Sequence, residues 1–370
     1  MHFLFFSLVV LTSPSAAPFA DPGLQAAVAD ALSSSPGRLP ESLVSLDASG
    51  RGIRSLQGIG TLRSLKRVNL ANNAIRDLGP LRALVGLEQI LVDNNAIVSL
   101  APLKGMHALR VFSAFGNRIQ SLEPARAWKS IVGITLADNA ITDLSPLAHR
   151  TTLRALWVPD NQIRDVSALA ALTGLKVLVL GNNPIENIEP IASLEAIVDL
   201  GLFGLPLGNT DIVKRMRGLK RMNLRDCRLA DIESLRALSD LEWVDLRDNA
   251  IADVSPLANH PKLSRLFLSN NQITDPRPLE SLEAIEWLVL DTNRIRAIGG
   301  LADLKTLKAV SLTNNQIGVD NWPQTAVALA RLNDRVRQVH FAPQEPASVY
   351  ADVPGSAATP DVDVEILNGD

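Results

Sequence analysis

The sequence IEWLVLDTNRI, residues 285–295, recurs in outline along most of the chain. Steps of 22 residues in both directions from Asn293 reach thirteen positions between residues 51 and 315. Eight residues before each of them is a leucine or isoleucine, from Leu43 to Leu307. A constant interval of this kind predicts a repeat protein, here with thirteen units. Ten of the positions are asparagine, namely Asn73, Asn95, Asn117, Asn139, Asn161, Asn183, Asn249, Asn271, Asn293 and Asn315, and the others are Arg51, Leu205 and Cys227.

Each unit is expected to hold one short strand. In residues 285–295, Leu288 and Leu290 are spaced as in a strand with one buried face. Later apolar residues, such as Ile298 and Leu301, face the same interior from the opposite side. A unit this small cannot bury its apolar residues alone, so neighbouring units must stack into one continuous core. The asparagine amide both donates and accepts hydrogen bonds, so stacked copies are expected to form a ladder that pairs with backbone groups.

Further segments make the assignment more specific. Residues 77–81 (DLGPL), 143–147 (DLSPL) and 253–257 (DVSPL) hold equivalent places in their units. With the Leu-x-x-Asn-x-Ile pattern, they resemble the leucine-rich repeat family, in the 22-residue class of bacterial internalins and of a eukaryotic phosphatase regulatory subunit. The resemblance implies an α/β solenoid, a horseshoe with a parallel β-sheet on its concave face and short 3₁₀ turns on its convex face. It implies less about function, because one fold serves many functions.

The N-terminal residues depart from the repeat. Residues 1–20 are predicted to be an export signal, since residues 3–11 are apolar apart from Ser7 and small residues follow them. No lysine or arginine precedes the apolar run, which leaves open a cytoplasmic protein with a hydrophobic start. The run is too short to span a bilayer. Residues 21–42 are predicted to form a helical cap, and residues 19–28 resemble the cap that precedes bacterial 22-residue repeats.

The array is predicted to extend over residues 43–322. Residues 323–343 are expected to form a capping helix and strand, because residues 336–341 repeat the strand spacing once more. Residues 344–370 are rich in proline, alanine and aspartate and are predicted to be a disordered acidic tail.

Composition bounds the possible partners. The 370-residue chain carries a net charge of −3 at pH 7. A small negative charge of this kind does not attract nucleic acid, which is therefore not an expected partner. The chain is also expected to be a monomer and to have no stable membrane span. A single cysteine excludes any intrachain disulfide. Because Cys227 stands at a ladder position, a structural role is favoured over a reactive thiol.

Several positions depart from the repeat. Leu205 and Cys227 interrupt the asparagine ladder at two successive units, which indicates either a change of curvature or simple sequence drift. Arg150 and His260 replace the leucine or methionine of other units, so both are expected to turn toward solvent.

The functional residues are expected on the concave strands, at the positions six, four and two residues before each ladder position, which point away from the core. Arg221, Trp243, Arg265 and Trp287 alternate along the first of these rows, which predicts Arg–Trp cation–π contacts of roughly 0.5 to 1 kcal/mol. Trp and Arg dominate binding hot spots, although such side chains could instead stiffen the sheet. The predicted partner-binding residues are Asp199, Phe203, Arg221, Arg225, Trp243, Asp245, Arg247, Arg265, Phe267, Trp287 and Asp291, with a second patch at Phe115 and Trp157.

Motifs for catalysis are missing from the sequence. The five histidines lie at no metal-binding spacing, and no phosphate-binding or nucleophile loop is present. Aspartates recur directly before ladder positions, for example Asp138 and Asp226, and could bind calcium or act as acids and bases. They come from the repeat itself, which favours a solvated rim. No cofactor and no metal are expected.

The hypothesis from the sequence is a non-catalytic scaffold that binds a partner protein on its concave face and is secreted or periplasmic in a bacterium. The alternative is a cytoplasmic regulatory subunit that docks on an enzyme such as a phosphatase. The identity of the partner is not encoded in any motif.

Overall fold

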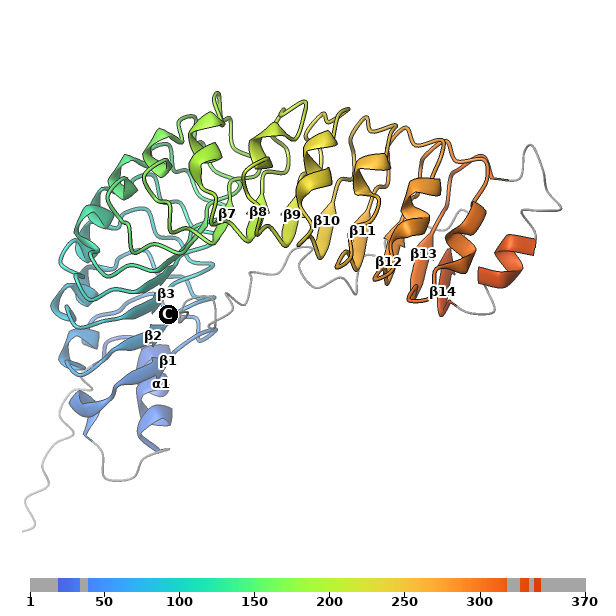
Figure 1. The fold of residues 1–370 in the computed structure, drawn as a ribbon. Coiled ribbons are helices and arrows are strands. Elements are labelled where there is room, and N and C mark those ends of the chain that lie inside the picture. The colour runs from blue at the N-terminus through green and yellow to red at the C-terminus, as the bar shows by residue number, and fades with distance from the viewer. Residues whose placement is uncertain (1–18, 34–38, 318–326, 333–335, 341–370) are drawn as a thin grey trace, which may run out of the picture.

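The computed structural model describes residues 19–33, 39–317, 327–332 and 336–340. These residues form one curved body, with a parallel sheet on its inner side and short 3₁₀ turns on its outer side (Figure 1). The 14 strands follow each other across the sheet in chain order. Helix α1 (Pro22–Ser33) precedes them. The predicted horseshoe with a helical N-terminal cap is confirmed.

The strands are three residues long and pair in a constant register. Ser45 lies opposite Arg67, and the same 22-residue offset continues to Trp287 and Ala309. The last pairing, Ala309 with Gln338, has a longer offset. The strands are β1 Ser45–Asp47, β2 Arg67–Asn69, β3 Gln89–Leu91, β4 Val111–Ser113, β5 Gly133–Thr135, β6 Ala155–Trp157, β7 Val177–Val179, β8 Asp199–Gly201, β9 Arg221–Asn223, β10 Trp243–Asp245, β11 Arg265–Phe267, β12 Trp287–Val289, β13 Ala309–Ser311 and β14 Gln338–His340.

Several of the convex turns begin with a carboxylate and a proline. In residues 143–147, Asp143 Oδ1 accepts the N–H of Ser145 at 2.7 Å, and the 3₁₀ turn Ser145–Leu147 follows. Pro146 supplies the φ angle that the turn requires, and Leu147 is buried in the core. Asp253 and Asp77 start their turns in the same way. The sequence pattern Asp-x-Ser/Gly-Pro-Leu is therefore a local folding signal.

The core is a continuous column of leucine and isoleucine. In the coil that contains β12, Ile285, Leu288, Leu290, Ile295 and Ile298 are all at most 1% exposed. Most coils bury the equivalent positions, although Ile185, Ile188, Leu207 and Ile317 are only half-buried, so each coil covers the apolar side of the next. Trp128 also belongs to this column and packs on Phe112, with ring centroids 4.9 Å apart.

Each asparagine of the ladder joins its own coil to the preceding one. Asn161 Nδ2 donates to Leu136 O at 2.9 Å in the preceding coil and to Val158 O at 3.2 Å in its own. Its Oδ1 accepts the N–H of Ile141 at 3.0 Å. The other ladder asparagines make the same set of bonds, from Asn73 to Asn315. Such bonds satisfy backbone groups that would otherwise be buried without partners.

Two coils lack this asparagine. Leu205 makes no equivalent side-chain bond, since it has no polar atom. Cys227 keeps one of the three contacts, because its Sγ lies 3.2 Å from Leu202 O. Burial raises the pKa of the Cys227 thiol to about 12, so the thiol is neutral and structural rather than reactive.

The residue before each ladder position has a positive φ angle in all thirteen coils. Ten are asparagine, aspartate or threonine, and Gly50, Gly116 and Gly204 complete the row. Glycine, asparagine and aspartate adopt this left-handed conformation at the lowest cost. The recurring aspartates are thus explained by backbone geometry. Thr292, at φ 53°, is the one β-branched residue of the row.

The two ends of the column are covered differently. Asp21 accepts N–H groups from Gly23 and Leu24 at the start of α1, and from Arg54 and Ser55 in the first coil. At the other end, residues 327–332 are helical and Leu332 is buried. Three predicted segments lie wholly or partly outside the described residues, namely residues 1–18 of the signal segment, residues 323–326, 333–335 and 341–343 of the capping segment, and the whole tail from residue 344.

The expectation for His260 was wrong. The side chain is 2% exposed, and its ring nitrogens lie 3.0 Å from the carbonyl oxygens of Leu257 and Leu235. Trp128, at the same repeat position, donates its Nε1 hydrogen to the equivalent carbonyl, of Leu103. This position therefore accepts a buried side chain that can donate to the preceding turn. Arg150 is only half-buried, but its Nε is covered and has no partner among the described residues.

Candidate binding surface

Three rows of side chains line the concave sheet. Between β8 and β12 they contain the predicted arginines and tryptophans, and we call the residues from Asp199 to Asp291 on these rows the C-terminal concave patch. The register sets Trp243 opposite Arg221 on one side and Arg265 on the other, and Arg265 opposite Trp287. Trp243, Arg265 and Trp287 are all half-buried and outside the core column. The indoles are therefore on the open face, as the row positions predicted.

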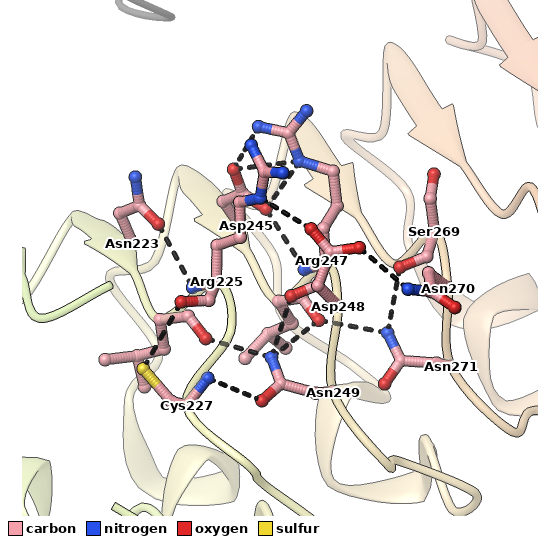
Figure 2. Close-up of polar contacts among 12 residues, drawn as sticks. Asn223, Arg225, Cys227, Asp245, Arg247, Asp248, Asn249, Ser269, Asn270 and Asn271 are labelled. Atoms are coloured by element: carbon pink, nitrogen blue, oxygen red, sulfur yellow. Dashed lines mark hydrogen bonds and ion pairs between the residues drawn. The ribbon is translucent and has the colours of Figure 1, made fainter. Parts of the chain in front are cut away.

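Three of the four arginines in the patch are held by aspartates. Arg221 pairs with Asp199, with Nη2 and Oδ2 2.8 Å apart. Arg225 Nε donates to Asp248 Oδ2 at 2.6 Å, and Arg247 Nε donates to Asp245 Oδ1 at 2.9 Å (Figure 2). Burial raises the pKa of Asp199 above its ordinary value, and the nearby Arg221 offsets part of that effect.

In each pair the aspartate is the deeper partner. The side chains of Arg221 and Asp199 are 49% and 19% exposed, and those of Arg225 and Asp248 are 53% and 30% exposed. For Arg247 and Asp245 the values are 18% and 0%. The formal charges cancel, but the guanidinium groups form the outer layer.

The predicted Arg–Trp stacking is wrong in detail. The cation–π contact recorded among the described residues is that of Arg247 over Phe267, 5.5 Å from the ring centroid. Trp243 packs on the same ring, at 5.6 Å between centroids. Phe267 is 2% exposed and Asp245 is fully covered, so neither is available for direct contact as predicted. Trp243 and Arg247 pack on the ring of Phe267, and Arg247 binds the carboxylate of Asp245.

Arg265 differs from the other arginines of the patch. It is half-buried between the two tryptophans, and it forms no ion pair with any described residue. Trp243 Nε1 is also covered without a hydrogen-bond partner in the described part of the chain. The patch therefore contains a cation and an N–H donor whose bonding capacity is unused.

The remaining predicted residues lie apart from this centre. Phe203 is half-buried with its ring over Gly181, where an added Cβ would lie 2.5 Å from a ring carbon. Asp291 is occupied by hydroxyl and N–H donors from Ser311 and Thr313. Phe115 and Trp157 are half-buried on separate coils. The structure records no ring contact between these two within the described ranges, so they do not form one cluster.

Concave polar groups that the sequence reading missed include Asp93. Its Oδ1 accepts the hydroxyl hydrogen of Ser113 at 2.5 Å and the N–H of Phe115 at 2.8 Å. Burial raises its pKa above the ordinary value despite these bonds. Asp93 and Asp291 share one repeat position and bind the next coil alike, so matching positions could have identified the first. In the described residues, no group of three or more His, Cys, Asp or Glu side chains could hold a metal ion.

Comparisons with known proteins agree with this architecture. The family model for leucine-rich repeats in two copies matches residues 151–193 and 239–281. A crystal structure of an internalin (InlF) from Listeria monocytogenes is 26% identical, with a TM-score of 0.66 over 93% of this chain and 96% of that chain. A leucine-rich repeat protein of Leptospira interrogans is 20% identical, with a TM-score of 0.60 over 84% of this chain and 97% of that chain. No curated protein matches the sequence.

The matched repeats and the open parallel sheet show that the chain has the leucine-rich repeat fold. Among proteins with this fold it is similar to the internalins, as the sequence pattern suggested. Among the described residues, none of the helices is both long and apolar enough to cross a membrane.

Proposed function

We propose that the chain is a non-catalytic scaffold that binds a partner protein on its concave face. The observation that carries the proposal is the group Trp243, Arg265 and Trp287, which is half-buried on an open sheet and keeps unused bonding capacity. Trp and Arg are the residue types that contribute most to protein–protein binding. A plant receptor kinase ectodomain with this fold, 16% identical and with a TM-score of 0.55, has been crystallised with Casparian strip integrity factor 2.

We also infer that the protein is exported from a bacterial cell, on the basis of its apolar N-terminal residues and its likeness to an internalin. N-terminal sequencing of the protein from its native host tests this part. A start between Pro18 and Asp21 in an extracytoplasmic fraction supports export. An intact Met1 in the cytosol instead supports the regulatory subunit that docks on an enzyme.

The binding surface is tested by replacing Trp243 and Trp287 with alanine. A partner is first identified by capture on the wild-type chain and mass spectrometry, and its affinity is then measured with each purified variant. Hot-spot side chains contribute about 2 kcal/mol or more, so the double variant should bind at least about 100-fold more weakly. Its Tm should fall by no more than about 4 °C, because neither indole belongs to the core.

Arg67→Gln is the matched control. Arg67 occupies the same row on β2, is exposed, and has Ser45 and Gln89 as its neighbours in place of tryptophans. Its replacement should leave the affinity unchanged. If the double tryptophan variant loses its stability while the identified partner still binds, the indoles serve to stiffen the sheet and the proposal fails.

A further inference from the structure

The outer layer of the C-terminal concave patch is positive although each of its three ion pairs is formally neutral. Asp199, Asp245 and Asp248 lie below the arginines that they bind. A guanidinium has five N–H donors, so Arg221 and Arg225 retain donors on their exposed sides. A partner that approaches the sheet meets guanidinium groups before it meets carboxylates, and this layering favours an anionic partner.

Arg265 marks one point in the patch where an anionic group of the partner is expected to bind. It has no carboxylate partner among the described residues, and an indole flanks it on each side along the strand row. A ligand that fits this arrangement carries a carboxylate for the guanidinium and aliphatic groups for the indoles, close together in the sequence. A segment in which acidic and aliphatic residues are neighbours has both, and it must bind in a conformation other than a regular strand, because successive side chains of a strand point to opposite faces.

The chain contains such a segment. Residues 361–366 read Asp-Val-Asp-Val-Glu-Ile, so every carboxylate is next to an aliphatic side chain. Residues 341–370 contain six Asp and Glu residues and no Lys or Arg. All of these residues lie outside the described part of the structure.

We propose that residues 361–366 bind over Arg265 on the concave face and compete there with the partner protein. The inference rests on the proposed function and specifies the chemistry of the ligand. The segment can reach this site, because the 20 residues between His340 at the end of β14 and Asp361 can span up to about 70 Å. Strand β11 is three strands from β14, which is about 15 Å.

The test uses the full chain and a labelled peptide. The amide variant carries Asp361→Asn, Asp363→Asn and Glu365→Gln. The control variant, Glu345→Gln, Asp352→Asn and Asp370→Asn, removes the same number of charges outside the alternating segment. The probe is a fluorescent peptide with the sequence of residues 359–370, and its binding to each protein is followed by anisotropy.

The peptide should bind the amide variant at least about tenfold more tightly than the wild-type chain, because a tethered segment acts at a millimolar effective concentration. The control variant should behave like the wild type. Arg265→Gln, introduced into the amide variant, should weaken peptide binding about tenfold, since it removes a charge-assisted hydrogen bond. Arg67→Gln in the same background should change nothing.

Equal affinity of the peptide for the wild-type chain and the amide variant would overturn the proposal, and so would an absence of binding to the amide variant. Neither result touches the proposed function, which depends on capture of the partner protein by Trp243 and Trp287. If the peptide binds as expected while capture is unaffected by the tryptophan replacements, the function proposal fails and the intramolecular contact remains.

Discussion

The three rows of side chains on the concave face, which we call the floor of the sheet, include two regions with the same strand register and different side chains. On β5 to β7 its three rows contain Gly133, Thr135, Ala155 and Trp157 among small or apolar neighbours, and no charged residue. On β8 to β12 the same rows contain arginines, aspartates and tryptophans. The strands of both regions pair with one register, and asparagines such as Asn161 and Asn249 bind backbone groups below each.

The difference shows that the solenoid does not require the charged rows. Glycine, alanine and threonine are buried in this part of the floor, and its strands keep the same register, so the ion pairs of β8 to β12 are not a condition for pairing the strands. Charged pairs at buried positions carry a desolvation cost that apolar residues avoid. Their concentration in one region supports the binding role that we propose for this face.

The largest expected effect comes from breaking the deepest ion pair. Arg247→Met leaves the fully buried carboxylate of Asp245 without its guanidinium, which should cost about 3 kcal/mol in the free energy of unfolding. The double variant Asp245→Thr, Arg247→Ala copies the residues of the uncharged floor, Thr135 and Ala137, and should lose less than about 1 kcal/mol. Urea denaturation of the three proteins measures both values. A single variant as stable as the double one would show that the pair is not coupled.

A second prediction concerns the boundary between the regions, where the ring of Phe203 lies on Gly181. Gly181→Ala places a Cβ within 2.5 Å of that ring and should destabilise the chain by about 1 to 3 kcal/mol, through overpacking. Gly218→Ala is the control, because nothing lies within 4 Å of its added Cβ. Phe203→Ala combined with Gly181→Ala should remove the clash, and a shift in the urea midpoint that persists in the combined variant would argue against it.

The smallest effect is a gain in stability. Thr292 holds a left-handed backbone position that Asp138, Asp160 and Asn182 occupy in the uncharged region. Thr292→Asn should therefore stabilise the chain by about 1 kcal/mol, because a β-branched residue is strained there. Asn182→Thr should have the opposite effect of similar size. Thermal melting of both variants gives the comparison, and a loss of stability in Thr292→Asn would contradict the explanation.

Much of the fold could be predicted because it depends on the spacing of the repeated residues. The interval between Asn73 and Asn315 determines the stacking, and the leucines at fixed offsets determine which side is buried. Row positions were also sufficient to place Trp243 and Trp287 on the open face. These features depend on spacing, which a sequence displays directly.

Side-chain partners could not be predicted in the same way. Whether Arg221 turns to Trp243 or to Asp199 depends on the orientation of its side chain, which row positions do not determine. The burial of Asp245 and Phe267 depends in the same way on where the side chains of Arg247 and Trp243 pack. His260 was placed outside because its charge was considered without the carbonyl groups of Leu235 and Leu257, although Trp128 at the same repeat position was a usable signal.

The junction at Asp21 has a consequence for the first coil in acid. Burial raises the pKa of this carboxyl group, but four backbone N–H donors outweigh burial and lower the pKa below its ordinary value. Its contribution to stability is therefore complete above the unfolded-state pKa and is lost as the pH falls through the lower, folded-state value. Because one carboxylate joins helix α1 to residues 54 and 55, acidification should detach the helix and fray the solenoid from its N-terminal end.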